Sequence, residues 1–212
     1  MSKPYYDEDG ITIYHGDCRE ILPQLDKVDL VLTDPPYGIG AAGGVGGDNC
    51  GKVKRTDDKW DDKPISQGVL MDCIDMGNYS CVFGGNYYVM PAAPCWLIWD
   101  KERTGNFADA EMAWTNYGCA VRLKRHRWNG MIRKGNEHRD HPTQKPLEIM
   151  EWCITLCPNN PQTILDHFMG SGTTLRAAKD LQRKCIGIEI EEKYCEIAAK
   201  RLSQSVLPLN FI

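Results

Sequence analysis

Two short apolar runs stand out in the pattern of hydrophobic and polar positions along the chain. Residues 28–33 lead directly into a proline-containing tetrapeptide at 34–37, and residues 163–165 lead toward a glycine turn at 170–172. Continuous apolar runs of this length, bounded by turn residues, are typical of strands that are buried on both faces. The pattern therefore predicts two buried strands, each followed by a polar motif.

The C-terminal third predicts alternating strands and helices. A helix is expected over residues 173–181, where Leu175, Ala178 and Leu181 recur at helical spacing. A strand at 185–190 follows, and then a helix from about Glu191 whose early acids suit its positive N-terminus. This β-α-β-α order is the signature of a parallel sheet with crossover helices.

The N-terminal part repeats that logic less regularly. Strands are predicted at residues 11–14, 79–83 and 96–99, a short helix at about 19–25, and a helix that begins near Pro146. The glycine-rich segment that opens at Gly38 has little periodicity, so a mobile loop is expected over about 38–62.

Composition restricts the class of protein. A chain of 212 residues with 42% hydrophobic and 25% charged residues suits one globular domain, over 1–212. No apolar run approaches the roughly 20 residues that span a bilayer, and the polar, acidic N-terminus does not resemble a secretory signal. We expect a cytoplasmic protein without a membrane role. The ten cysteines are scattered without a CxxC pair, which favours reduced, mostly buried thiols over disulfides or a metal site.

Charge is distributed unevenly. The net charge of −4 argues against a nucleic-acid partner, yet residues 122–139 contain seven Lys or Arg residues against one acid, with Trp128 among them. Such a run by itself is commonly a solvated surface loop. An aromatic residue within it favours a nucleic-acid surface.

The glycine turn has neighbours that suit a nucleotide-like ligand. Gly170 and Gly172 permit a sharp turn and close approach of a ligand, Asp166 lies at the end of one strand, and Glu189 ends the next strand, near the spacing at which an acid reaches ribose hydroxyls. A glycine turn that only packs a helix on a strand is the alternative. NAD is a poor fit because Leu175 stands where its fingerprint requires another glycine.

Asp17 is a third strand-end acid. Its carboxylate can accept a hydrogen bond from an adenine amino group, or it can cap the helix expected near residue 19.

The tetrapeptide Asp34-Pro35-Pro36-Tyr37 carries the most specific chemistry. Its two prolines remove two N–H donors and stiffen the turn, so that the Asp34 carboxylate and the Pro35 carbonyl can act as neighbouring acceptors for one amino group. Accepting both N–H bonds favours a pyramidal nitrogen with its lone pair aimed at an electrophile. Tyr37 would stack on a base. A plain turn is the alternative, although few such turns end an apolar strand.

The chain resembles the β-class amino-methyltransferases that act on DNA, in which the DPPY motif precedes the FxGxG motif. The resemblance rests on GDC at 16–18, TDPPYG at 33–38, WDK at 99–101, HPTQKP at 141–146 and FMGSGTT at 168–174. It implies a Rossmann-like α/β fold with a mostly parallel seven-stranded sheet, helices on both faces and a circularly permuted motif order. It implies S-adenosylmethionine as the methyl donor.

The resemblance also assigns roles to residues. Asp34, Pro35, Pro36 and Tyr37 hold the target amino group, and Glu189 takes the ribose hydroxyls while Asp17 approaches the adenine. The remaining cofactor residues come from the strand-end acid, the FMGSGTT segment and HPTQKP, which shapes the methionine end of the donor pocket: Asp166, Phe168, Gly170, Ser171, Gly172, Thr173 and Lys145.

These features together predict a DNA methyltransferase that acts on adenine N6, because the resemblance associates Asp before the prolines with adenine and Ser with cytosine. Cytosine-N4 methylation, methylation of RNA or of a protein glutamine, and a non-catalytic DNA- or cofactor-binding module are the alternatives. Residues 122–140 leave room only for a short basic target-recognition region. Members of the family are often dimers, which leaves a homodimer open.

Overall fold

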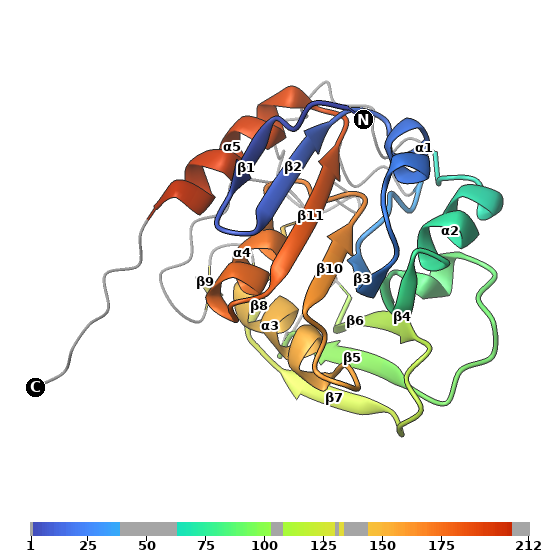
Figure 1. The fold of residues 1–212 in the computed structure, drawn as a ribbon. Helices are drawn as coiled ribbons and strands as arrows, with labels where there is room; N and C mark the ends of the chain where they lie inside the picture. Colours follow the sequence, from blue (N-terminus) through green and yellow to red (C-terminus); the bar gives the residue numbers. More distant parts are fainter. Residues whose placement is uncertain (1, 39–62, 103–107, 130–131, 134–143, 205–212) are drawn as a thin grey trace, which may run out of the picture.

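The computed structural model describes residues 2–38, 63–102, 108–129, 132–133 and 144–204. Within these residues a nine-stranded sheet crosses the molecule (Figure 1). In spatial order its strands are β1 (Tyr6–Glu8), β2 (Ile11–His15), β11 (Lys184–Glu189), β10 (Thr163–Asp166), β3 (Val28–Thr33), β4 (Gly77–Phe83), β6 (Ala110–Thr115), β5 (Trp96–Asp100) and β7 (Arg122–Arg125).

The centre of the sheet is parallel. Strands β2, β11, β10, β3 and β4 run in one direction, whereas β6 is antiparallel to β4 and to β5. The carboxyl ends of parallel strands meet at one edge, and open α/β sheets bind ligands there. The end of β3 is therefore brought beside the ends of β10 and β11, although β3 is far from both in the chain.

Helices cover both faces of the sheet. The side chains of α3 (Leu147–Leu156), α4 (Thr173–Asp180) and α5 (Glu192–Ser203) join one core cluster, and those of α1 (Cys18–Ile21) and α2 (Gln67–Ile74) join clusters on the other side. Two short 3₁₀ turns, η1 (Leu22–Gln24) and η3 (Gly85–Tyr87), and a small hairpin of β8 (Trp128–Asn129) and β9 (Ile132–Arg133) complete the described elements.

Strand β3 explains why its sequence is a continuous apolar run. Leu30 and Leu32 point into the α3–α4–α5 side, whereas Val31 between them belongs to the core cluster under α1. Successive side chains of a strand alternate between faces, so a strand covered on both sides carries apolar residues on both of them, and the polar residues of β3, Asp29 and Thr33, lie toward its two ends. The run therefore marks a central strand.

The predicted fold class is confirmed, as are the predicted strands and helices apart from small shifts at their ends. The helix expected at about 19–25 is shorter, because Pro23 within η1 cannot continue the α-helical ladder. The described sheet has nine strands where seven were implied. The additional edge strands β1 and β7 are mostly polar, so the sequence has no apolar run from which they could be predicted.

Two predicted regions lie partly outside the described residues. The expected loop at 38–62 is described only at Gly38, and the basic region at 122–140 is described only over 122–129 and 132–133. None of the described helices has the length and apolar character needed to cross a bilayer. The described cysteines are free thiols, and all of them except Cys119 are buried.

Candidate active site

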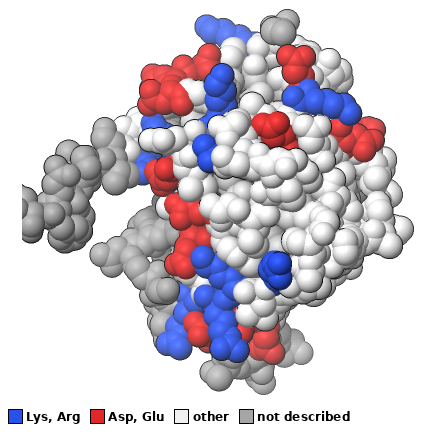
Figure 2. Space-filling model, turned by 60° about the horizontal axis from the view of Figure 1, so that its bottom comes forward, with Lys and Arg blue, Asp and Glu red and all other residues white. Residues whose placement is uncertain are grey.

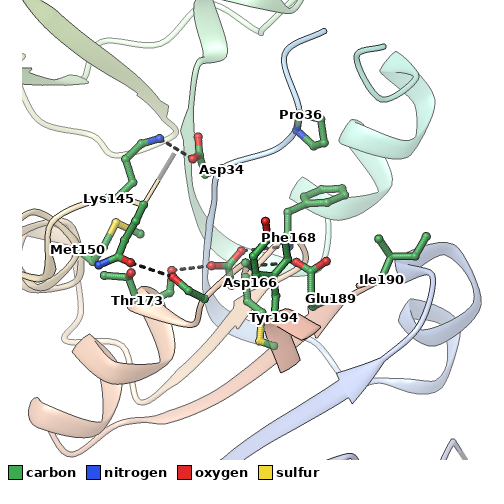
Figure 3. A pocket seen from close by; sticks show the side chains of 15 residues that line it. Asp34, Pro36, Lys145, Met150, Asp166, Phe168, Thr173, Glu189, Ile190 and Tyr194 are labelled. Carbon is green, nitrogen blue, oxygen red and sulfur yellow. Dashed lines mark hydrogen bonds and ion pairs between the residues drawn. The ribbon is translucent and has the colours of Figure 1, made fainter. Parts of the chain in front are cut away.

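A pocket opens at the carboxyl edge of the sheet, and β3, β10 and β11 all contribute to it. Asp34 and Lys145 lie on one side of the view in Figure 3, Glu189 and Ile190 on the other, and Phe168 between them. The complete lining is Asp34, Pro36, Gln144, Lys145, Met150, Asp166, Phe168, Met169, Gly170, Ser171, Thr173, Thr174, Glu189, Ile190 and Tyr194. The two sequence motifs therefore share one pocket.

Asp34 follows β3 and lines the pocket. The side chain is 20% exposed, and its two oxygens have different donors: the Tyr37 hydroxyl donates to Oδ1 and the Lys145 ammonium to Oδ2. Burial raises the pKa of Asp34, and the nearby positive charge of Lys145 opposes that rise. The carboxylate can thus accept hydrogen bonds from groups that enter the pocket.

Tyr37 is held by two neighbours of its ring. It stacks on Tyr87 with a centroid distance of 4.8 Å and an interplanar angle of 19°. Gly84, at φ 64°, lies against the ring, where an added Cβ would come within 2.0 Å of Tyr37 Cε1. The Tyr88 hydroxyl donates to the Pro36 carbonyl. These neighbours orient the tetrapeptide, and Gly84 in particular was not singled out from the sequence.

Glu189 ends β11 at the other side of the pocket. Its Oε2 accepts a hydrogen bond from the Gly170 N–H at 3.0 Å, and its Oε1 accepts one from the Glu191 N–H at 2.9 Å. Burial raises the pKa of Glu189 to about 6. Because a carboxylate has about four lone-pair sites, two remain for the hydroxyls of a ligand.

Comparisons with known proteins identify the family of this chain. A family model described as DNA methylase, N6_N4_Mtase, matches residues 81–200, more than half of the chain. The chain belongs to this DNA methylase family.

Among its relatives is the type II methyltransferase M2.LlaDCHI of Lactococcus lactis subsp. cremoris, which is 28% identical over 96% of this chain and 93% of its own length. Type II methyltransferase M2.DpnII of Streptococcus pneumoniae is 25% identical over 95% of this chain and 93% of its own. Each match covers nearly the whole length of the relative as well as of this chain.

Solved structures that are similar to this chain include the M1.HpyAVI–SAM complex. That complex is 27% identical in sequence and has a TM-score of 0.57, and the match covers 90% of this chain and 99% of that one. The cytosine-N4-specific PvuII DNA methyltransferase has a TM-score of 0.65 over 97% and 91% of the two chains, but at 16% identity it shows only the shared fold.

Within this methylase fold, the polar contacts of Asp166 are made by the protein itself. Its Oδ1 accepts from Thr33 Oγ1 at 2.9 Å and from the Phe168 N–H at 3.2 Å, and its Oδ2 accepts from Thr174 Oγ1 at 2.5 Å. Burial raises its pKa to about 6. Asp166 therefore ties β3, β10 and α4 together beneath the pocket.

Most of the predicted site residues line the pocket, and a few lie beside it. Asp17 accepts from the Arg19 N–H at 2.9 Å and caps α1, the alternative that the sequence left open, so its contact with adenine stays a prediction. Pro35, Tyr37 and Gly172 adjoin lining residues without lining the pocket themselves.

Other lining residues were not predicted individually: Gln144, Met150, Met169, Thr174, Ile190 and Tyr194. Gln144, Met169 and Thr174 belong to the motifs HPTQKP and FMGSGTT, so membership of these motifs could have predicted them as pocket residues. Ile190 follows Glu189, and only the assembled sheet edge indicates that it faces the pocket.

Proposed function

We propose that this protein transfers a methyl group from S-adenosylmethionine to the exocyclic amino group of a base in DNA, and that the base is adenine. The single observation that carries the proposal is that Asp34 and the Glu189–Gly170 pair line the same pocket. An acceptor for an amino group and a site for a nucleoside must be adjacent if a methyl group is to pass directly between two bound molecules.

The residues present fit S-adenosylmethionine. Glu189 retains acceptor capacity for ribose hydroxyls, Gly170 lines the pocket without a side chain, and Phe168 and Ile190 supply apolar surface for a purine. Bound there, the cofactor supplies an electrophilic methyl group on a sulfonium. The predicted cofactor residues thus keep their assigned roles as parts of the proposal, with Lys145 nearer the acceptor side than the resemblance suggested.

In this proposal, Asp34, Pro35 and Tyr37 bind the target base. The Asp34 carboxylate and the Pro35 carbonyl accept the two N–H bonds of the amino group, which turns the nitrogen lone pair away from the ring. The Tyr37 ring stacks on the base, a contact worth about 1 to 3 kcal/mol. A base in duplex DNA has to leave the stack first, at a cost of a few kcal/mol.

The choice of adenine N6 rests on Asp34 as the first residue of the tetrapeptide, the form that the resemblance associates with adenine. Cytosine N4 remains the second candidate, because cytosine also carries an exocyclic amino group and the same acceptors suit it.

A group of Lys and Arg side chains near β7 supports a DNA substrate. Figure 2, which brings the β7 edge of the sheet forward, shows Lys and Arg side chains gathered low on this face with acids among them. Arg122 and Arg125 on β7 are exposed, although Arg125 also pairs with Asp100 at 3.3 Å. Cations on such a surface contact phosphates and position a duplex without reading its sequence.

The test is to incubate the protein with S-adenosylmethionine and unmodified DNA and to identify modified nucleosides by mass spectrometry. We expect N6-methyladenine, and the Asp34→Ala variant as the matched negative control should form none. N4-methylcytosine would overturn the assignment of the base. Methylation of RNA or protein but not DNA would overturn the substrate class.

A further inference from the structure

Four charged side chains form a chain that leads away from Asp34. Lys145 Nζ pairs with Asp34 Oδ2 and lies 3.2 Å from Glu111 Oε2, and Glu111 Oε1 lies 2.5 Å from Lys101 Nζ. The members come from four segments: the end of β3, the segment before α3, β6, and the residue after β5. Lys145 therefore bridges two carboxylates, only one of which belongs to the tetrapeptide.

Burial of the charged Lys145 side chain carries a desolvation penalty. Its side chain is 7% exposed, and its ammonium lies 5.1 Å from the centroid of the Phe83 ring and 5.9 Å from that of Tyr37. Burial alone would lower the pKa of Lys145, but Asp34 and Glu111 outweigh it and raise that pKa above its ordinary value. Lys145 therefore stays charged.

Glu111 is also held as an anion. Burial would raise its pKa, but Lys145 and Lys101 together bring the pKa below its usual value. Lys101 is the lysine of the WDK motif, so the network gives that motif a role. With two lysines and two carboxylates, the network is electrically balanced.

The network has a consequence for substrate binding. Each oxygen of Asp34 already has one donor, Tyr37 at Oδ1 and Lys145 at Oδ2. An amino group that binds the free lone pair of Oδ2 shares that oxygen with the ammonium and weakens the contact of Lys145 with it. A buried ammonium that loses its partner is strongly destabilised. Glu111 removes that penalty, because Lys145 already faces its Oε2 and can move its hydrogen bonds there.

We propose that Lys145 and Glu111 are positioning residues of the methyl transfer: Lys145 keeps Asp34 charged before the base arrives, and Glu111 receives the ammonium when the base amino group takes its place. The inference rests on the proposed role of Asp34 as the acceptor of that amino group. An ordinary structural ion pair would stabilise the fold without coupling Glu111 to base binding.

The first experiment follows the Asp34 carboxyl carbon directly by NMR on protein labelled with ¹³C at the aspartate carboxyls, with Asp34→Asn identifying the signal. The charged and titratable groups that face Asp34 are Lys145, Glu111, Tyr37 and Asp166. Lys145→Met should raise the pKa of Asp34, and Glu111→Gln should lower it. Shifts in one direction, or none, would overturn the proposal whether or not the protein methylates DNA.

The second experiment is a double-mutant cycle on methylation kinetics. Glu111→Gln should raise KM for DNA or lower kcat by about tenfold, since the ammonium then has no alternative charged partner. In the Lys145→Met background the same change should cost almost nothing, because no ammonium needs to move. The S-adenosylmethionine affinity of the Glu111→Gln variant should stay within about threefold of the wild type.

The matched control is Asp180→Asn, which removes an ion pair with Arg176 at 3.0 Å from a side chain that is 28% exposed, as Glu111 is. This control should leave kcat, KM for DNA and the Asp34 titration unchanged. If Glu111→Gln behaves like Asp180→Asn, or if the effects of Glu111 and Lys145 simply add, the two residues serve the fold alone. Should Lys145→Met fail to fold, the lowered pKa of Asp34 and the kinetic loss in Glu111→Gln decide the question.

Discussion

Replacing Asp34 by Asn should separate methyl transfer from cofactor binding. The substitution preserves the size of the side chain but removes its charge and converts one acceptor oxygen into an N–H donor. Asp34 lies across the pocket from Glu189, whose contacts are made to Gly170 and Glu191. Cofactor affinity should therefore be spared while catalysis is lost.

The magnitude follows from the charge that develops on the amino nitrogen as it gains the methyl group. A unit charge about 4 Å from the Asp34 carboxylate interacts by about 4 kcal/mol at an effective dielectric constant of 20. Loss of that interaction corresponds to roughly a thousandfold decrease in kcat. The part-buried setting of Asp34, 20% exposed, justifies a value between those for water and a dry interior.

Two assays are needed on one preparation. Single-turnover methylation of unmodified DNA gives the rate of the chemical step, and isothermal titration calorimetry gives the dissociation constant for S-adenosylmethionine. We expect a large fall in rate with a dissociation constant within about threefold of the wild type. A rate within tenfold of the wild type, or a loss of cofactor affinity as large as the loss of rate, would refute the assigned division of labour.

The other predictions concern the cofactor, the DNA and the fold. Glu189→Gln should weaken S-adenosylmethionine binding by roughly 10- to 100-fold in calorimetry, because charge-assisted hydrogen bonds are worth about 1.5 to 3 kcal/mol; unchanged binding would exclude Glu189 from the site. Methylation should fall as salt rises, and Arg122→Gln should make that dependence shallower if β7 contacts phosphates, whereas a flat response would make β7 an ordinary surface. Burial lowers the pKa of His167 to about 3, so the folded protein excludes a proton that the unfolded chain binds below about pH 6.5. His167→Leu should therefore lose less stability than the wild type between pH 7 and pH 5, by about 2 kcal/mol in urea melts, and parallel losses would contradict the buried neutral histidine.

The parts of the fold that could be predicted from the sequence are those in which burial decides residue type. Strand β3 was predicted with its observed bounds because both of its faces are covered, which leaves a run of apolar residues between polar neighbours. Strand β7 has the sequence Arg-Leu-Lys-Arg and was interpreted only as part of a basic region. An edge strand is held by backbone hydrogen bonds to its neighbour, and those bonds leave little mark on the sequence.

The site shows the same division at the level of single residues. The tetrapeptide and the glycine turn were predictable because each concentrates rare residue types at a strand end. Glu111 and Gly84 were not, because their roles exist only across strands: Glu111 reaches Lys145 from β6, and Gly84 clears the space that the Tyr37 ring fills. Motif resemblance placed Lys145 near the cofactor, but the structure adds its contact with Asp34, which depends on side-chain geometry.

The alignment of the two motifs depends on how β3 is fixed against β10. At one end of the pair, Asp29 Oδ2 accepts from the Gln162 and Thr163 N–H groups at 2.9 and 3.0 Å. At the other end, Thr33 Oγ1 donates to Asp166 Oδ1 at 2.9 Å. A slip of one residue would move one strand end by about 3.3 Å and turn every side chain to the opposite face.

Catalysis is less tolerant than folding, since a misplacement of about 1 Å can cost roughly a hundredfold in rate. The polar side chains at both ends of these buried strands therefore do more than fill space in the core. They fix the register in which Asp34 and the turn at Gly170 reach the same level of the sheet edge. Under the proposed function, segments more than a hundred residues apart then act on one pair of bound molecules, whichever motif comes first in the chain.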